Sequence, residues 1–113
     1  MFIAMNRFKV KKGSEAAFEQ VWTERESYLD SMPGFVEFHL LKGPAADDHT
    51  LYASHTVWRS RDNFAAWTRS KAFRDAHARA GNTSSTASLY LEHPKFEGFE
   101  VRQTLTSTGA RVA

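Results

Sequence analysis

The chain has 113 residues, of which 42% are hydrophobic and 25% are charged, and its net charge is +2. These values indicate one globular domain, exclude a wholly disordered chain and give no reason to expect a nucleic-acid partner. The absence of cysteine excludes a disulfide scaffold, a thiolate nucleophile and an iron–sulfur centre. The lack of cysteine also fits a cytoplasmic protein. No apolar run approaches the roughly 18 residues of a transmembrane helix, so we expect no membrane partner.

The first predicted element is a strand over residues 2–10. Its even positions form an apolar face, which Asn6 interrupts with a primary amide. Ser14 can cap the helix that follows. In that helix the apolar side chains recur at helical spacing, at Ala17, Phe18, Val21, Trp22 and Tyr28. The helix is expected to end near Leu29, ahead of a turn at Pro33 and Gly34.

Two strands are predicted next, over residues 35–42 and 50–59. Both alternate apolar and polar side chains, and the segment 43–49 between them contains Gly, Pro and two Asp. Because the two strands follow each other with only this loop between them, we expect them to pair as a hairpin.

A second helical region is predicted to begin at Ser60 and to run through Phe64 and Trp67. The polar residues 68–71 indicate a break or kink. Ser70 can then cap another segment, whose apolar side carries Phe73, Ala76 and His77.

A last strand is predicted over residues 96–104, and residues 105–113 are expected to form a flexible tail. The order β-α-β-β-α-β is that of the ferredoxin-like split motif, an α+β fold in which two helices cover one face of an antiparallel sheet. The sequence therefore predicts a single domain over residues 1–104. The uncovered face would keep apolar side chains, so we also predict a homodimer.

Asn6, Trp67 and His77 are the candidate functional residues. A buried amide at position 6 must find hydrogen-bond partners or cost about 1–3 kcal/mol, and a backbone partner or a β-bulge would account for it. Trp67 shares the apolar stripe of its helix with Phe64 and could be a core residue. His77 follows Phe73 on the apolar side and could be a core or surface residue, but the small alanines around it leave room for a flat ligand. Trp67 and His77 could face one pocket only if the helix bends between them.

Other common kinds of active site have little support in the sequence. The four remaining histidines have no metal-ligand spacing, and the chain has no dinucleotide-binding or phosphate-binding glycine motif and no nucleophile elbow. The chain has nine Phe, three Trp and three Tyr, which is rich for so small a core. Some of these rings are expected to face a partner subunit or a flat ligand.

Several stretches of the sequence resemble the IsdG-type haem-degrading monooxygenases, small members of the antibiotic biosynthesis monooxygenase (ABM) superfamily. The matching stretches are Ala4-Met5-Asn6-Arg7-Phe8, Pro33-Gly34-Phe35, Thr56-Val57-Trp58-Arg59-Ser60 with Phe64, Trp67, Phe73 and Ala76-His77, and Phe96-Glu97-Gly98-Phe99-Glu100-Val101. The last stretch is most similar to the rhizobial type. The part around Trp58 and Trp67 is shared by much of the superfamily, whereas the combination of Asn6, Trp67 and His77 is more specific.

The resemblance implies a dimeric α/β barrel of ferredoxin-like subunits, each with one haem that is both the substrate and the oxygen-activating cofactor. It implies that His77 is the axial ligand of the haem iron, that Asn6 is the distal amide and that Trp67 pushes on the macrocycle. The pocket lining would include Trp22, Arg25 and Phe64. Neutral imidazole suits haem iron, and an amide N–H would stabilise negative charge on the reacting oxygen.

The resemblance thus favours a haem-degrading monooxygenase that uses O₂ and external electrons and releases iron and a bilin-type product, with biliverdin favoured. The electrons would come from a reductase or a small reductant, because the chain has no reductase motif. Two alternatives stay open. One is a cofactor-free ABM oxygenase that acts on an aromatic polyketide or quinol, and the other is a dimer that binds haem or another small molecule without catalysis.

Overall fold

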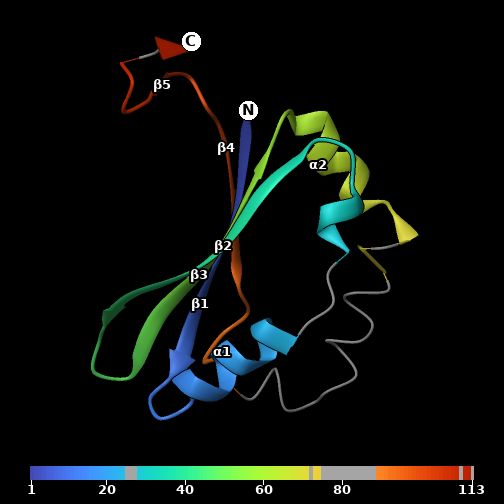
Figure 1. Ribbon diagram of the computed structural model, residues 1–113. Helices are drawn as coiled ribbons and strands as arrows, with labels where there is room; N and C mark the ends of the chain where they lie inside the picture. Colours follow the sequence, from blue (N-terminus) through green and yellow to red (C-terminus); the bar gives the residue numbers. More distant parts are fainter. Residues whose placement is uncertain (25–27, 72, 75–88, 110, 113) are drawn as a thin grey trace.

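The computed structural model describes residues 1–24, 28–71, 73–74, 89–109 and 111–112 (Figure 1). Its centre is a four-stranded antiparallel sheet with the strand order β2-β3-β1-β4. The elements in chain order are β1 (Phe2–Lys11), α1 (Glu15–Glu24), the 3₁₀ turn η1 (Leu29–Ser31), β2 (Phe35–Ala45), β3 (His49–Trp58), α2 (Arg61–Thr68), β4 (Lys95–Glu100), β5 (Thr104–Leu105) and β6 (Arg111–Val112). The predicted ferredoxin-like α+β fold is confirmed.

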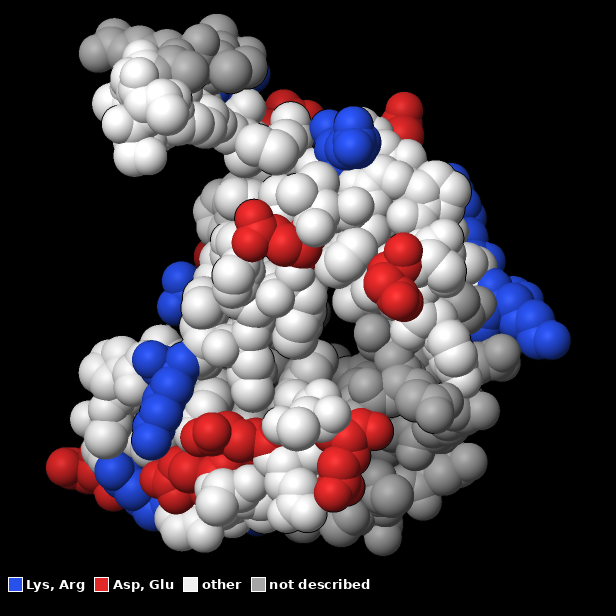
Figure 2. Space-filling view, in the orientation of Figure 1, with Lys and Arg blue, Asp and Glu red and all other residues white. Residues whose placement is uncertain are grey.

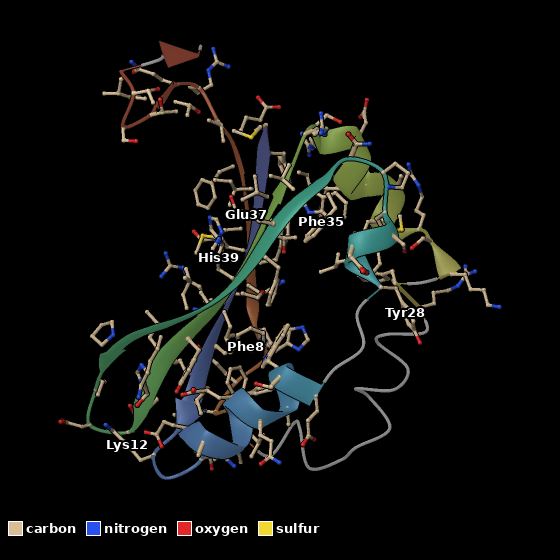
Figure 3. The ribbon with its side chains drawn as sticks, in the orientation of Figure 1. Phe8, Lys12, Tyr28, Phe35, Glu37 and His39 are labelled. Carbon is tan, nitrogen blue, oxygen red and sulfur yellow. The ribbon has the colours of Figure 1, made fainter. Side chains whose placement is uncertain are left out.

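The two helices α1 and α2 lie on the same side of the sheet (Figure 1). The helices cover only one face of the sheet, and the side chains along each strand alternate between the helix side and the uncovered side. In Figure 3, Phe8 and Phe35 point to the helix side, whereas Glu37 and His39 point to the opposite side. The predicted apolar face of β1 is buried under the helices through Phe2, Ala4, Phe8 and Val10.

Two separate hydrophobic clusters lie on the helix side of the sheet. The α1 cluster consists of the buried residues Phe8, Val10, Phe18 and Tyr52. The α2 cluster consists of the buried residues Phe2, Ala4, Trp58 and Trp67. Burial of one large apolar side chain contributes roughly 1.5–3 kcal/mol, so each cluster holds its own helix on the sheet. The strand residues Asn6 and Ser54, which lie between the clusters, belong to neither.

The start of α2 is anchored to the turn before β2. Ser60 is the N-cap as predicted, since its Oγ accepts a hydrogen bond from the Asn63 N–H at 3.2 Å. Gly34 has φ +80°, and a Cβ at this position would lie 2.2 Å from Asn63 Cγ. The Arg59 N–H also donates to the Gly34 carbonyl at 2.8 Å. Only glycine fits both this backbone conformation and this close contact.

The predicted break after Trp67 is confirmed, because α2 ends at Thr68. The Ser70 hydroxyl then accepts a hydrogen bond from the Phe73 N–H at 3.1 Å, as expected of a residue that caps a new turn. The rest of this predicted segment, including Ala76 and His77, lies outside the described residues.

The end of the first helix differs from the sequence prediction. The α1 helix is described up to Glu24, and Leu29 lies in the 3₁₀ turn η1. Tyr28 has a left-handed backbone conformation with φ +59°, which a continuous α-helix does not contain. The expectation of one helix that reaches Leu29 was therefore wrong.

The hairpin between β2 and β3 has a shorter loop than predicted. The strand β2 continues to Ala45, and β3 begins at His49. The register shifts between Lys42 and Ala45. Because β2 is an edge strand, Pro44 can lie within it without removing a hydrogen bond from the ladder.

The C-terminal region leaves the sheet after β4. The predicted strand 96–104 ends at Glu100, and β5 pairs with β6 in a separate two-stranded sheet. Figure 1 shows β5 apart from the main sheet. The flexibility of residues 105–113 stays a prediction. None of the helices that the structure describes is long and apolar enough to cross a membrane.

Candidate active site

A cavity of about 520 Å³ lies on the helix side of the sheet. An opening near the centre of Figure 2 lies between α1, α2 and the strands. Pockets of roughly 300–1,000 Å³ are typical of small-molecule sites. The cavity occupies the space between the α1 cluster and the α2 cluster, so the same packing that holds the helices also leaves the site open.

The floor of the cavity is a strip of small and polar side chains on the two central strands. Ala4 and Asn6 come from β1, and Ser54 and Thr56 come from β3. Ala4 pairs with Thr56, and Asn6 pairs directly with Ser54. These four side chains take up little space, and three of them, Asn6, Ser54 and Thr56, place hydrogen-bonding groups in the middle of the sheet, whereas aromatic rings fill both ends.

Aromatic side chains form the wall on the α2 side. Trp67 is 7% exposed and contacts Phe73 edge to face, with ring centroids 5.4 Å apart and an interplanar angle of 88°. Phe64 stacks on Phe96 with centroids 5.6 Å apart and an angle of 12°. All four residues line the cavity. The break after α2 matters here, because the Ser70 cap directs the chain so that Phe73 meets Trp67.

Trp22 forms the wall on the α1 side. Its ring stacks on Phe38, with centroids 5.6 Å apart and an angle of 18°, and contacts Phe8 of the α1 cluster edge to face at 5.8 Å. Trp22 and Phe38 both line the cavity. Trp22 therefore lies at the boundary between the packed α1 cluster and the cavity.

The amide of Asn6 has no structural partner among the residues that the structure describes. The register of β1 with β3 and with β4 is unbroken through Asn6, so no β-bulge is present. Its side chain makes no hydrogen bond with a described residue and lines the cavity. The two structural explanations that the sequence allowed are thus not found in the described part of the chain, and the amide remains available to a ligand.

Charged groups contribute little to the described lining, in which Asp30 is the one ionisable residue. Two groups with shifted pKa values, Tyr52 and Glu15, belong to contacts that dock α1 on the sheet. Burial and a 2.5 Å hydrogen bond to Glu19 raise the pKa of Tyr52. A backbone hydrogen bond and the Thr50 hydroxyl lower the pKa of Glu15. The described residues also contain no group of three candidate metal ligands.

The cavity brings together most of the site residues that the sequence predicted, namely Asn6, Trp22, Phe64 and Trp67. Arg25 and His77 lie outside the described residues. The sequence analysis missed Ser54, Thr56 and Phe96. The only signal for Ser54 was its place on the Tyr52–Trp58 side of an alternating strand, and the sequence did not tell which side faces the helices.

The family model described as antibiotic biosynthesis monooxygenase matches residues 1–79. The chain belongs to this family. The heme oxygenase (staphylobilin-producing) of Staphylococcus haemolyticus is a relative of this ABM protein, with 30% identity over 108 residues. The match covers 96% of this chain and 98% of the relative.

Two solved structures have a fold similar to that of this chain. The heme-degrader MhuD from Mycobacterium tuberculosis, with two hemes bound in its active site, has a TM-score of 0.67 and 23% identity, and covers 94% of this chain and 100% of its own. SnoaB, a cofactor-independent oxygenase from Streptomyces nogalater, has a TM-score of 0.64 and 30% identity, and covers 92% and 95%. The shared fold therefore accommodates chemistry with haem and chemistry without a cofactor.

Proposed function

We propose that this ABM protein is a haem-degrading monooxygenase, which opens the haem macrocycle with O₂ and external electrons and releases iron and a bilin-type product. The observation that carries the proposal is the position of the Asn6 amide, which has no partner among the described residues, on the floor of an aromatic cavity. The staphylococcal relative, a heme oxygenase that is 30% identical over 96% of this chain, supports the same activity.

The described cavity residues fit a haem. The group is flat and largely apolar, and the rings of Trp22, Phe64 and Trp67 offer it apolar walls around a volume of about 520 Å³. Arg25, which directly follows α1 in the sequence, would complete the lining near Trp22. A bound haem supplies the iron at which O₂ is activated.

His77 is proposed as the axial ligand of the haem iron. This role rests on the resemblance to the haem-degrading family and on sequence position, since His77 follows the cavity residue Phe73 by four positions. A neutral imidazole binds haem iron through one ring nitrogen, and a hydrogen bond at the other nitrogen sets its basicity.

Asn6 and Trp67 are proposed to act on the bound haem. The Asn6 amide would donate a hydrogen bond where negative charge develops on oxygen, which lowers the barrier because the donor is already in place. Trp67 is held between Trp58, at a centroid distance of 6.2 Å, and Phe73, at 5.4 Å. A ring fixed in this way can press on a macrocycle without moving aside.

The electron source and the product are further parts of the proposal. Ring opening consumes electrons, and the chain has no reductase motif, so a reductase or a small reductant must supply them. Biliverdin is the proposed product, because the last strand is most similar to the rhizobial type of the family.

We also propose a homodimer, formed through the sheet face that the helices do not cover. All four strands place apolar side chains on this face, among them Ile3, Met5, Leu41, Val57 and Phe99. Leu41 is 40% exposed and Phe99 44% exposed. Contiguous apolar surface of this kind marks an interface, and a second copy of the same face satisfies it by two-fold symmetry.

Light scattering on the purified protein tests the dimer. The expected mass is about 26 kDa, twice the chain mass of 12.8 kDa, and Phe99→Lys should give a folded monomer because it places a charge in the interface. A wild-type monomer would contradict the proposed assembly.

A cofactor-free oxygenase is the second candidate. SnoaB favours it, since this cofactor-independent enzyme is 30% identical and covers 92% of this chain. In this case the cavity would hold an aromatic polyketide or quinol, and His77 would bind no iron. A dimer that binds haem or another small molecule without catalysis is the third possibility.

Titration of the purified protein with hemin separates these candidates. We expect a shifted Soret band at one hemin per chain, and loss of this band in His77→Ala. His93→Ala is the matched control, because His93 is an exposed histidine outside the cavity lining. A wild-type protein that leaves the hemin spectrum unchanged would favour the cofactor-free oxygenase.

A further inference from the structure

Two buried hydroxyl groups lie on the same face of β3 and have different surroundings. Thr50 is 3% exposed, and its Oγ1 donates a hydrogen bond to Glu15 Oε2 at 2.9 Å. Ser54 is 4% exposed, and its Oγ bonds to no residue that the structure describes. Buried hydroxyl groups almost always have a partner, so the difference between the two requires an explanation.

The cavity explains the difference. Ser54 lines the cavity. Thr50 lies further along the same strand, beyond Tyr52, and does not line it. In the described structure, the buried side-chain atoms sealed from solvent without a partner are His55 Nδ1 and Trp58 Nε1, and Ser54 Oγ is not among them. The Ser54 hydroxyl is therefore open to the cavity and available to whatever occupies it.

Ser54 is also the direct cross-strand partner of Asn6. Side chains at paired positions on one face of an antiparallel sheet have Cβ atoms about 4.5–5.5 Å apart. The amide and the hydroxyl are thus close enough to reach one small ligand together. Both groups are neutral and both can donate a hydrogen bond.

We propose that Ser54 is a second ligand-contacting donor of the active site, which works with Asn6 to bind a small anionic or oxygen ligand on the sheet-facing side of the haem. This inference rests on the proposed haem-degrading function and adds to it. Two neutral donors from adjacent strands form a preorganised site for negative charge. An oxyanion hole stabilises charge in the same way, with donors that are already in place. The rigid central strands hold both donors, so little reorganisation is needed when charge develops.

Azide binding to the ferric haem complex tests the inference without turnover. Haem affinity is measured first by Soret titration, and azide affinity is then measured on the loaded protein. Ser54→Ala is expected to keep haem affinity within about twofold and to weaken azide binding about tenfold or more, as for the loss of a hydrogen bond to a charged group. Ser54→Thr keeps a hydroxyl and is expected to bind azide with nearly wild-type affinity.

Thr50→Val is the matched control, because it removes a buried hydroxyl from the same face of the same strand outside the cavity. It should lower thermal stability and leave azide affinity unchanged. Wild-type azide affinity in Ser54→Ala, with haem bound normally, would overturn the role of Ser54 and leave the proposed function intact. A wild-type protein that binds no haem would overturn the proposed function, and the inference with it.

Discussion

The α1 cluster and the cavity wall on the α2 side are built from the same kinds of residue but do different things. At the α1 end, Phe8 and Phe18 pack with centroids 5.2 Å apart, and Phe18 is 1% exposed. On the α2 side, Phe64 and Phe73 are partly buried and line the cavity. In both regions the helix contributes rings from an apolar stripe, Phe18 from α1 and Phe64 from α2, so an aromatic stripe alone does not distinguish core from site.

The floor beneath the rings is what separates the two regions. Under α1 the floor is Phe8, Val10 and Tyr52, which fill the space up to the helix. Between the helices the floor is Asn6 and Ser54, which are smaller and polar. The strand residues therefore decide whether the aromatic rings above them close a core or surround a ligand.

Truncation of one ring from each region should have the largest effect. Phe18→Ala is expected to lower the free energy of unfolding by about 3–5 kcal/mol, because it opens a void in a fully packed cluster. Phe64→Ala should cost less stability, since Phe64 is partly exposed already, and should weaken haem binding more. Urea unfolding of both variants measures stability, and hemin titration measures haem affinity. Equal losses of stability and of haem affinity in the two variants would contradict the difference between core and cavity wall.

Asn6→Ala tests the floor itself. It should leave haem binding and the free energy of unfolding close to wild type, because the amide has no partner among the described residues. Ring opening should slow about 10²–10³-fold, as for removal of one donor at a developing negative charge. Single-turnover loss of the Soret band under reductant and air gives the rate. An unchanged rate would exclude the distal role.

Trp67→Phe tests a residue with two roles, since Trp67 is part of the α2 cluster and also of the cavity wall. We expect a stability loss of about 1–3 kcal/mol from the smaller ring. Haem should still bind but with a less distorted macrocycle, which resonance Raman spectra report. Spectra and products identical to wild type would indicate that Trp67 is only a core residue.

Tyr52→Phe is expected to have the smallest effect. The Tyr52 hydroxyl donates to Glu19 at 2.5 Å, and loss of such a bond costs about 1–2 kcal/mol. Burial and the Glu19 bond raise the pKa of Tyr52 above its ordinary value. The stabilisation from this hydrogen bond is therefore complete below about pH 10, the unfolded-state pKa of tyrosine, and is lost as pH rises beyond it. Urea unfolding should show a smaller difference in unfolding free energy between wild type and variant at pH 11 than at pH 8. An equal difference at both pH values would contradict a contribution from the Tyr52 hydroxyl.

Local sequence patterns predicted the strands, the Ser60 cap and the break after Trp67, because hydrophobic period and capping chemistry act over a few residues. They also singled out Asn6, since a polar residue on an apolar strand face is a local anomaly. Ser54 and Phe96 could not be found in this way. Both join the site only through the register of β1 with β3 and with β4, which pairs residues distant in the chain. The left-handed conformation of Tyr28 likewise has no local signal in its residue type.

Turnover of bound haem tests the central claim most directly. The protein is loaded with haem without oxygen and is then exposed to O₂ and ascorbate with catalase present, so that free peroxide does not contribute. We expect the Soret band to disappear, iron to become available to a chelator, and mass spectrometry to find an open-chain tetrapyrrole at the mass of biliverdin. Haem that is recovered intact after this treatment would contradict the account and would identify a binding protein instead.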